Sequence, residues 1–270
     1  MNARLSALRL FFALPYFRGR DRIIGFLSDS FVQKPIKLGD GLRMFLDASE
    51  YVQLEILVHG ATEPLTLALI RKLVAVGDSV VDVGAHIGHH ALVAAQEAGS
   101  KGRVIAIDPQ PYNADRIACH AVLNSLDTIT TICAAAGTLD SFVSLPVQSE
   151  RDRSRMSLHQ AGPNDLSVSV EVPLRRLDTI FAQHSLGEVK LLKIDVEGYE
   201  LEVLRGVGSR LSDCRNIILE LLEGTGAERN REVVNLLSAQ GSDLFDVTGK
   251  PWQGAMPLPE CNIWAVRSDK

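Results

Sequence analysis

Between Ser79 and Cys133 the chain alternates apolar runs with segments of helical spacing, and this alternation limits the possible folds more than any other feature. The expected strands are Ser79–Val83, Val104–Ile107 and Ile129–Cys133, and the expected helices are Gly88–Ala98 and Pro111–Leu126. Strand, helix and strand in succession predict a parallel sheet with crossover helices. The strand runs are largely apolar rather than alternating, as in a sheet covered on both faces. We therefore expect an α/β fold.

The same alternation returns further along the chain. We expect strands at Val189–Ile194 and Asn216–Leu221 and helices at Glu200–Leu211 and Glu228–Ser238. Two last strands, Leu244–Val247 and Ile263–Val266, are joined by a Gly/Pro loop that leaves no room for a crossover helix. Such a short connection predicts an antiparallel pair.

The length of 270 residues suits one sizeable α/β domain with an extension. We assign residues 1–60 to an N-terminal extension that contains a helix and a strand pair, at Ile36–Leu38 and Leu42–Leu46. Residues 61–270 form the main domain, which opens with a helix at Glu63–Val76.

Composition restricts the setting and the partners. The apolar stretch Ala7–Phe17 is too short to span a bilayer and is interrupted by Arg9 and Pro15, so we expect no stable membrane insertion but a packing helix, suited to a homodimer interface. A net charge of −5 does not indicate a broad nucleic-acid-binding face. The cysteines form no C-x-x-C pair, and a reducing, cytoplasmic setting fits them best. Cys133 and Cys214 adjoin strand runs and are expected to be buried.

Two strands, Ser141–Val147 and Ser167–Val172, are expected on either side of a polar segment, 148–165, that is rich in turn residues. Two interpretations of this segment stay open. It is either a solvated hairpin connection or a lid that contacts the substrate with its arginines.

The stretch VVDVGAHIGHHALVAA joins an expected strand to an expected helix through Gly84 and Gly88. Glycine lets a ligand approach the backbone, and the helix points N–H groups at the same place. The ligand is a dinucleotide, a phosphate group or S-adenosylmethionine. The dinucleotide pattern G-x-G-x-x-G is absent. Asp82 would repel a pyrophosphate but suits the ammonium and sulfonium groups of S-adenosylmethionine.

The next strand ends in IDPQP, where Asp108 can accept hydrogen bonds from two ribose hydroxyls. Dehydrogenases and methyltransferases share this feature. The Asp82-x-Gly84 turn and the closing antiparallel strands favour a methyltransferase, because a dinucleotide fold would usually stay parallel. A nicotinamide-dependent oxidoreductase or a non-catalytic nucleotide-binding module is the alternative from another class.

The stretch LLKIDVEGYELEVLRG ends a buried strand with Asp195 and Glu197. Polar side chains at that sheet edge would lie beside the reactive end of a cofactor. Their structural alternative is to cap the next helix, which applies most to Glu200. Lys193 lies inside the strand, where we expect it to pair with a carboxylate.

Together, VDVGAHIG, IDPQP and LKIDVEGYELEVLRG followed by IILELLE resemble the FkbM-type family of S-adenosylmethionine-dependent methyltransferases. The resemblance implies a class I Rossmann-like methyltransferase fold, with helices on both faces of a mostly parallel seven-stranded sheet whose last strand is antiparallel. It also implies O-methylation of a hydroxyl on a small molecule, natural product or sugar/glycan, with S-adenosylhomocysteine as the second product. An RNA or protein methyltransferase is the alternative among methyltransferases.

The resemblance also implies roles for single residues. Asp108 would hold the ribose, Glu63 would lie near the methionine end of the cofactor, and Asp195 and Glu197 would lie at the transferred methyl group. Asp195 is the first candidate for the base or orienting group of the acceptor hydroxyl, and Glu197 is the second. The expected cofactor-binding residues are Glu63, Asp82, Gly84, Ala85, His86, Gly88, Asp108 and Asp195.

Members of the family often have Asn in place of His86 and Glu in place of Asp108. His89 and His90 extend the histidine cluster, but their spacing points the three rings in different directions. We therefore expect no metal there and at least one histidine on the helix surface. Asp195 and Glu220 fall where some O-methyltransferases hold a divalent cation, an alternative that we do not favour.

Overall fold

The computed structural model describes residues 34–146, 169–221, 227–254 and 257–268. The chain divides into two compact units, one of residues 1–64 with 148–155 and one of residues 65–147 with 156–270. The large sheet belongs to the second unit. The described part of the first unit contains a strand pair and a helix.

In the first unit, β1 (Ile36–Lys37) and β2 (Arg43–Met44) pair antiparallel at the predicted place, although both are shorter than predicted. The helix α3 (Tyr51–His59) was not predicted. Glu50 caps it, since its carboxylate accepts hydrogen bonds from two first-turn amides at 3.2 and 2.9 Å. The stretch Ala7–Phe17, and with it the expected dimer interface, lies outside the described residues.

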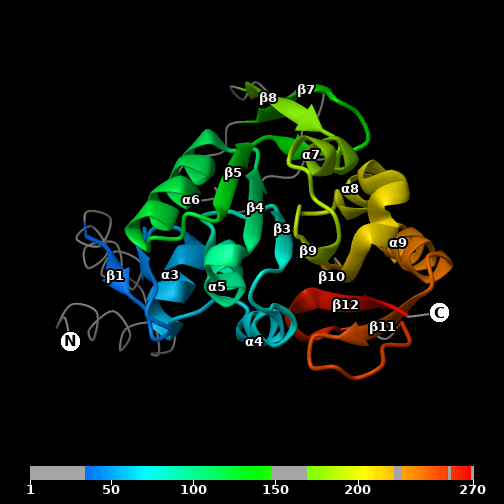
Figure 1. Cartoon of the computed structure of the whole chain (residues 1–270), viewed down its shortest axis with the longest axis horizontal. Coiled ribbons are helices and arrows are strands. Elements are labelled where there is room, and N and C mark those ends of the chain that lie inside the picture. The colour runs from blue at the N-terminus through cyan, green and yellow to red at the C-terminus, as the bar shows by residue number, and fades with distance from the viewer. Residues whose placement is uncertain (1–33, 147–168, 222–226, 255–256, 269–270) are drawn as a thin grey trace, which may run out of the picture. The chain divides into compact units, whose positions relative to one another are not determined.

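The second unit is built on a seven-stranded sheet with the order β11-β12-β10-β9-β3-β4-β5 (Figure 1). Its strands are β3 (Ser79–Val83), β4 (Arg103–Asp108), β5 (Ile129–Cys133), β9 (Val189–Ile194), β10 (Cys214–Glu220), β11 (Ser242–Asp246) and β12 (Asn262–Arg267). Neighbouring strands are parallel except where β12 lies between β10 and β11. The predicted α/β sheet with an antiparallel last strand is confirmed.

Helices cover both faces of the sheet. They are α4 (Pro64–Leu73), α5 (His89–Ala98), α6 (Pro111–Leu123), α7 (Leu177–Gln183), α8 (Glu200–Val207) and α9 (Ala227–Ala239). Side chains of α7, α8 and α9 share a core cluster with Val81, Ile105 and Leu192 of the sheet. The helices α5 and α6 pack on β3, β4 and β5 from the other side (Figure 1). The sheet face that carries Asp82 is therefore the α5 face.

Some boundaries differ from the predicted ones. The helices α4 and α6 end before the predicted residues. α8 ends at Val207, because Gly208 has a φ of 59° and starts a 3₁₀ helix that runs to Asp213. The short helix α7 was not predicted.

A second sheet has three strands in the order β6-β8-β7. β7 (Ser141–Pro146) and β8 (Ser169–Arg175) correspond to the two predicted strands and pair antiparallel. The two-residue strand β6 (Ala135–Ala136) was not predicted. The polar segment 148–165, with both of its interpretations, lies outside the described residues.

Cys214 is 2% exposed, as predicted for a strand residue. The prediction for Cys133 is wrong, because this residue is exposed. Cys133 is the last residue of β5, and β5 is an edge strand with a neighbour on one side only. An apolar run therefore indicated the strand correctly but not the burial of its final residue.

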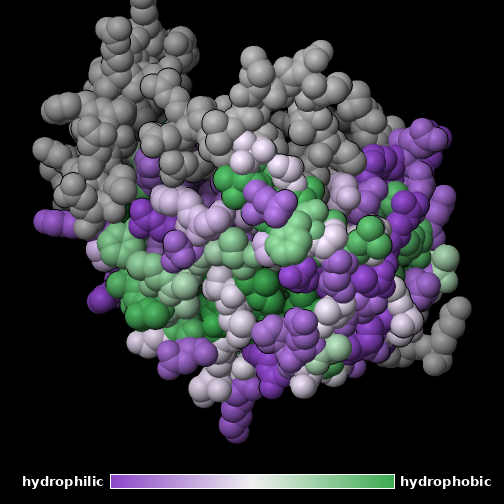
Figure 2. All heavy atoms as spheres, turned by 90° about the horizontal axis from the view of Figure 1, so that it is seen from above, coloured by the Kyte–Doolittle hydropathy of each residue, from purple (hydrophilic) through white to green (hydrophobic). Residues whose placement is uncertain are grey.

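Among the residues that the structure describes, no helix is both long and apolar enough to cross a membrane. The face shown in Figure 2 carries hydrophilic and hydrophobic residues side by side. The exposed large hydrophobic residues come from several helices, strands and loops: Tyr51, Leu65, Val76, Val122, Leu139, Phe142 and Val170. One of them is partly shielded, since the Arg175 guanidinium lies 5.7 Å from the centroid of the Phe142 ring.

A side chain from the other end of the unit caps helix α4. The Glu260 carboxylate accepts hydrogen bonds from the amides of Leu65 and Thr66 and from the Thr66 hydroxyl, each at 2.8 Å. Glu260 and Cys261 both have a φ of 54°, which is uncommon for residues with a side chain. This turn delivers a negative charge to the N-terminus of α4 and ties the helix to β12.

Replacing Glu260 with Gln is expected to lower the free energy of unfolding by about 1 kcal/mol, because the charge and one acceptor are lost. Urea denaturation measures the change. The exposed strand residue Glu171 gives the matched control, and Glu171→Gln should stay within about 0.5 kcal/mol of wild type. Equal stability of the two variants would show that the cap contributes nothing.

Candidate active site

Strand register gathers the polar side chains of the site on one face of the sheet. Residues paired across neighbouring parallel strands point to the same face, and Asp82 of β3 pairs with Lys193 of β9. These two form the inner row. The next residues on that face, at the carboxyl ends of their strands, are Asp108, Asp195 and Glu220, which form the outer row. Charged groups thus concentrate at the edge where ligands of such sheets bind.

Gly84 brings the ends of β3 and β9 closer than a side chain would allow. Its φ is 78°, and a Cβ atom there would lie 1.7 Å from the carbonyl oxygen of Asp195. The Asp195 amide also donates to the Val83 carbonyl at 2.9 Å. The sequence analysis explained Gly84 by the close approach of a ligand. The contact with Asp195 is a second reason why only glycine fits at this position. The turn and the candidate catalytic residue are therefore joined through the backbone.

Asp108 holds the turn with both carboxylate oxygens. Oδ2 accepts a hydrogen bond from the His86 amide at 2.9 Å, and Oδ1 accepts from the Gln110 amide at 2.9 Å and the Asn113 side chain at 3.0 Å. Burial raises the pKa of Asp108 to about 7, although these hydrogen bonds oppose the rise. An oxygen can accept two hydrogen bonds, so Oδ2 keeps one position for a ligand.

The rest of the turn lies where the sequence placed it, between β3 and α5. Ala85 is buried, and its amide donates to the Ile107 carbonyl at 3.0 Å. His86 is half-buried and has a φ of 51°, an uncommon left-handed backbone. Gly88 has a φ of 91° and precedes the first residue of α5. The positive φ angles of Gly84, His86 and Gly88 thus give the backbone of this turn its shape beside Asp108.

Helix α6 supports this turn from behind. The side chain of Ile117 lies 3.1 Å from where a Cβ of Gly88 would be. His120 is fully buried, and its Nδ1 is 2.9 Å from the Ile87 carbonyl oxygen. Asn113 and His120 were missed by the sequence analysis. Their spacing, i and i+7 on the buried face of a predicted helix, was the signal that could have found them.

Lys193 pairs with a carboxylate, as predicted. Its Nζ lies 2.9 Å from Asp195 Oδ2, and the two side chains are 3% and 26% exposed. Asp82 is 2% exposed, and the backbone amide of Ala91 in α5 interacts only weakly with its carboxylate. Burial raises the pKa of Asp82 to about 6, and the charge of Lys193 opposes this rise. One buried cation thus faces two carboxylates, of which Asp195 is the accessible one.

The turn after β9 separates the roles of its acidic residues. Glu200 is buried, and its Oε1 accepts hydrogen bonds from the amides of Val196 at 3.2 Å and Gly198 at 3.0 Å. Burial raises its pKa. Glu200 therefore holds the turn that precedes α8, and its capping of the helix itself stays a prediction. Glu197 is half-buried and has a left-handed φ of 53°. Asp195 instead contacts Lys193, and its side chain at the carboxyl end of β9 is 26% exposed.

The three histidines of the turn face the interior. His89 is 4% exposed, His86 and His90 are half-buried, and the rings of His89 and His90 are 6.1 Å apart. The expectation of a histidine on the helix surface is wrong, because the first turn of α5 packs toward the sheet. Burial first, and then the charge of Lys193, keeps the pKa of His90 well below its usual range. Within the described ranges no group of three or more His, Cys, Asp or Glu is arranged to hold a metal ion.

The sequence analysis also singled out the carboxylates of Glu63 and Glu220. Glu63 belongs to the first unit, directly precedes α4 and has a φ of 45°. Its place near the methionine end of a cofactor stays a prediction. Glu220 is half-buried at the end of β10 and pairs in register with Asn262, which is fully buried. The Asn262 side chain donates to the Glu260 carbonyl at 2.9 Å, so it is held by the turn that caps α4.

Three comparisons bear on this site. The model of the methyltransferase FkbM domain matches residues 82–244. The methyltransferase sdnD of Sordaria araneosa is 28% identical over 195 residues, which cover 61% of this chain and 73% of that protein. The hexuronic acid methyltransferase AglP of Haloferax volcanii is 27% identical over 169 residues, which cover 60% of this chain and 62% of that protein.

A solved structure, the methyltransferase FkbM from Methylobacillus flagellatus KT, superposes with a TM-score of 0.49 at 17% identity, and the match covers 92% of this chain and 60% of that one. The chain thus spans less than two thirds of this protein and of AglP. The family match contains both rows of the site, from Asp82 to Glu220. The chain belongs to the FkbM family of S-adenosylmethionine-dependent methyltransferases, with their class I fold.

Proposed function

We propose that the chain transfers the methyl group of S-adenosylmethionine to a hydroxyl oxygen of a small molecule, natural product or sugar. The observation that carries the proposal is Asp195, an accessible carboxylate at the end of β9 that a buried lysine holds in place. Two relatives support the class of reaction. Both are named methyltransferases, and the name of AglP specifies a hexuronic acid, a sugar rich in hydroxyl groups.

The two rows of the site fit this cofactor, which supplies a methyl group activated on a sulfonium. A cationic ligand suits Asp82, because its carboxylate is buried and only weakly hydrogen-bonded. Asp108 keeps an acceptor position for a ribose hydroxyl beside the glycine turn. The proposed cofactor-binding residues are Glu63, Asp82, Gly84, Ala85, His86, Gly88, Asp108 and Asp195.

Asp195 is proposed to orient the acceptor hydroxyl and to take its proton as the new C–O bond forms. Its Oδ2 is bound to the Lys193 ammonium at 2.9 Å, which leaves Oδ1 to receive the hydroxyl hydrogen. An ion-paired carboxylate is a weak base, so alignment of the hydroxyl is its main contribution. Glu197, on the turn that follows, is the second candidate for this role.

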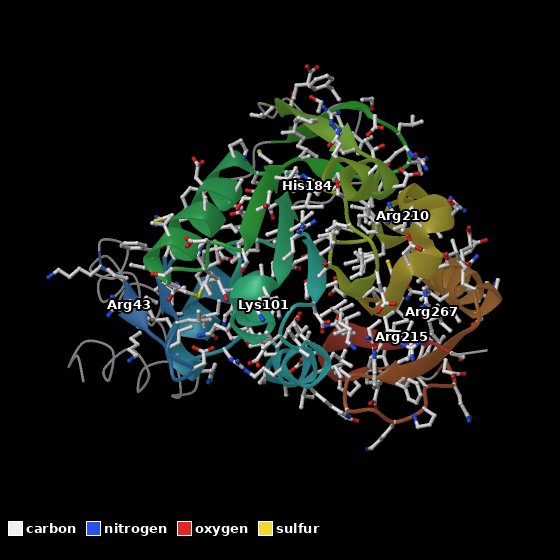
Figure 3. All side chains as sticks on the ribbon, viewed as in Figure 1. Arg43, Lys101, His184, Arg210, Arg215 and Arg267 are labelled. Carbon is white, nitrogen blue, oxygen red and sulfur yellow. The ribbon has the colours of Figure 1, made fainter. Side chains whose placement is uncertain are left out.

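A small-molecule or glycan acceptor, rather than nucleic acid, is part of the proposal. Five basic residues labelled in Figure 3 come from different elements of the second unit: Lys101, His184, Arg210, Arg215 and Arg267. Two of them already have acidic partners, since Arg210 pairs with Asp213 and Arg267 lies 3.9 Å from Glu188. The net charge of −5 also gives no broad basic excess of the kind that nucleic-acid binding requires.

We also propose a catalytic domain at residues 61–270, an N-terminal extension at residues 1–60 and a reducing, cytoplasmic setting. The family match starts at residue 82 and the large sheet starts at Ser79, which supports this division. The setting is supported by the four cysteines, all of which are free thiols. The homodimer stays a prediction.

Calorimetric titration with S-adenosylhomocysteine, with NADH in parallel, tests the cofactor. We expect binding of the first and none of the second, because Asp82 would repel a pyrophosphate. The reverse result would contradict the proposal. Release of S-adenosylhomocysteine is then followed over a panel of hexuronic acids, hexoses, phenols, RNA and protein. Methylation of RNA or protein alone would exclude the hydroxyl acceptor proposed here.

Binding of S-adenosylhomocysteine at pH 6 is expected to release about half a proton or more from Asp108. Burial holds the pKa of this carboxyl at about 7 in the free protein, so it is mostly protonated at pH 6. A ribose hydroxyl that donates to it favours the carboxylate, so its pKa falls on binding and the proton leaves. Above pH 8 the group is already ionised and the release should disappear.

The proton count comes from binding enthalpies in buffers with different ionisation enthalpies. Asp108→Asn should release correspondingly fewer protons than wild type at pH 6. Asp115→Asn, at an exposed position of α6, is the matched control and should behave like wild type. Unchanged release in Asp108→Asn would assign the proton to another group.

A further inference from the structure

Lys193 is a buried ammonium in a position that strand geometry would allow an apolar residue to fill. In its row across the sheet, Asp82 lies on one side and Ile218 on the other, and Ala106 follows beyond Asp82. The Lys193 side chain is 3% exposed. Its neighbours on the strand, Leu192 and Ile194, are fully buried.

Stability does not explain this choice of residue. Removing an ammonium and its partners from water is costly, and well-packed apolar residues often stabilise such positions equally well. The charge of Lys193 is therefore the property that needs a reason. Its two carboxylate neighbours provide this reason. Asp195 is the proposed orienting group, and Asp82 lies in the inner row, one row below the carboxyl ends of the strands.

We infer that Lys193 is a positioning residue for methyl transfer, whose single ammonium fixes the Asp195 carboxylate and balances the charge of Asp82. The inference rests on the proposed function of this site. Lys193 is too buried to touch the acceptor, so it acts through the two carboxylates. With all three groups charged, the cluster keeps an excess of one negative charge, which complements a cationic cofactor.

The other titratable groups around this cluster come from two sides. On the α5 side lie His86, His89 and His90, and the low pKa of His90 keeps that ring neutral near pH 7. Two further carboxyl groups lie near the cluster. Asp108 interacts with the charge of Asp82, and Glu200 interacts with the charge of Asp195. Lys193 supplies the positive charge that offsets these acids.

The experiment measures the dissociation constant of S-adenosylhomocysteine between pH 5 and pH 9. In wild type, affinity is expected to fall in two steps, below about pH 7 as Asp108 takes up a proton and further below about pH 6 as Asp82 does. The midpoint compared between variants is the lower one, that of Asp82. In Lys193→Met the midpoint should move up by at least about one pH unit, because burial then acts on both carboxylates without an opposing charge. Affinity at pH 7 should accordingly be roughly tenfold weaker.

Two variants control for effects of structure alone. Lys190→Met removes a lysine from the same strand, at a half-buried position outside the two rows, and should keep the wild-type midpoint. Lys193→Arg keeps the charge, so its midpoint should stay within about 0.3 pH units. Its kcat should still fall about tenfold, because a wider guanidinium displaces Asp195.

An unshifted midpoint in folded Lys193→Met, or a wild-type profile without a midpoint, overturns the inference. If Lys193→Met shows no melting transition, Lys193→Arg decides: an unchanged midpoint with lowered kcat supports the inference, and a shifted midpoint overturns it. Failure of wild type to bind S-adenosylhomocysteine at any pH is a different result, because it contradicts the proposed function itself.

Discussion

Asp195→Asn is expected to lower kcat by about 10²–10⁴-fold and to leave the affinity for S-adenosylhomocysteine within about threefold. Asparagine keeps the shape of the side chain, and its oxygen can still accept the hydrogen bond from Lys193 at the 2.9 Å seen with Asp195. With that oxygen bound to Lys193, the remaining NH2 group can neither accept the hydrogen bond that aligns the acceptor hydroxyl nor take its proton. Initial rates with saturating cofactor and acceptor, together with calorimetry, measure the two effects separately.

Asp213→Asn is the matched control for this substitution. Asp213 is also a half-buried, ion-paired carboxylate, but it pairs with Arg210 in the 3₁₀ helix that precedes β10, at the opposite end of the strands. Its replacement should leave kcat unchanged. Full turnover in Asp195→Asn would remove the proposed role of Asp195. A large loss in Glu197→Gln instead would transfer the role to the second candidate.

Gly84→Ala is expected to lower the melting temperature by roughly 10 °C and to abolish binding of S-adenosylhomocysteine. An alanine in the left-handed conformation costs about 1–2 kcal/mol, and overpacking adds about 1–3 kcal/mol. The added Cβ would lie 1.7 Å from the Asp195 carbonyl oxygen, so β3 and β9 must separate at their ends. That separation also breaks the bond between the Asp195 amide and Val83.

Gly187→Ala gives the control, because this glycine lies shortly before β9 and a Cβ there would meet no atom within 4 Å. Its melting temperature should stay close to that of wild type. Differential scanning calorimetry with and without S-adenosylhomocysteine compares the two variants. Wild-type melting and binding in Gly84→Ala would mean that the close contact between the strands is not needed.

The strands of the large sheet were predictable because their signal is local. The run Val189–Ile194 is mostly apolar, with Lys190 and Lys193 as its two charged residues, and its bounds were predicted correctly. The short elements α3, α7 and β6 carry no comparable signal. With few residues, each depends on contacts made by the rest of the fold rather than on a periodic pattern.

The site was predictable only in part. The turn at Gly84 and the acids Asp108 and Asp195 follow strands, so their place at the sheet edge could be inferred from the sequence. The pairing of Asp82 with Lys193 could not, because it depends on β9 lying beside β3, whereas β4 is the next strand of that sheet along the chain. Strand order also explains why the contact of Gly84 with Asp195 was not predicted, since the sequence did not show that the two residues are neighbours.

The cap on α4 has a consequence for the synthesis of the protein. The Leu65 amide and the Glu260 carboxylate that binds it are 195 positions apart in the chain. At about 5–20 residues per second, a ribosome needs roughly 10–40 s to make the segment between them. During that time α4 lacks its cap, and until β9 emerges β3 lacks a neighbour on one side. The nascent chain thus keeps one edge of β3 unpaired until β9 has been made, and the cofactor can stabilise only a nearly finished polypeptide.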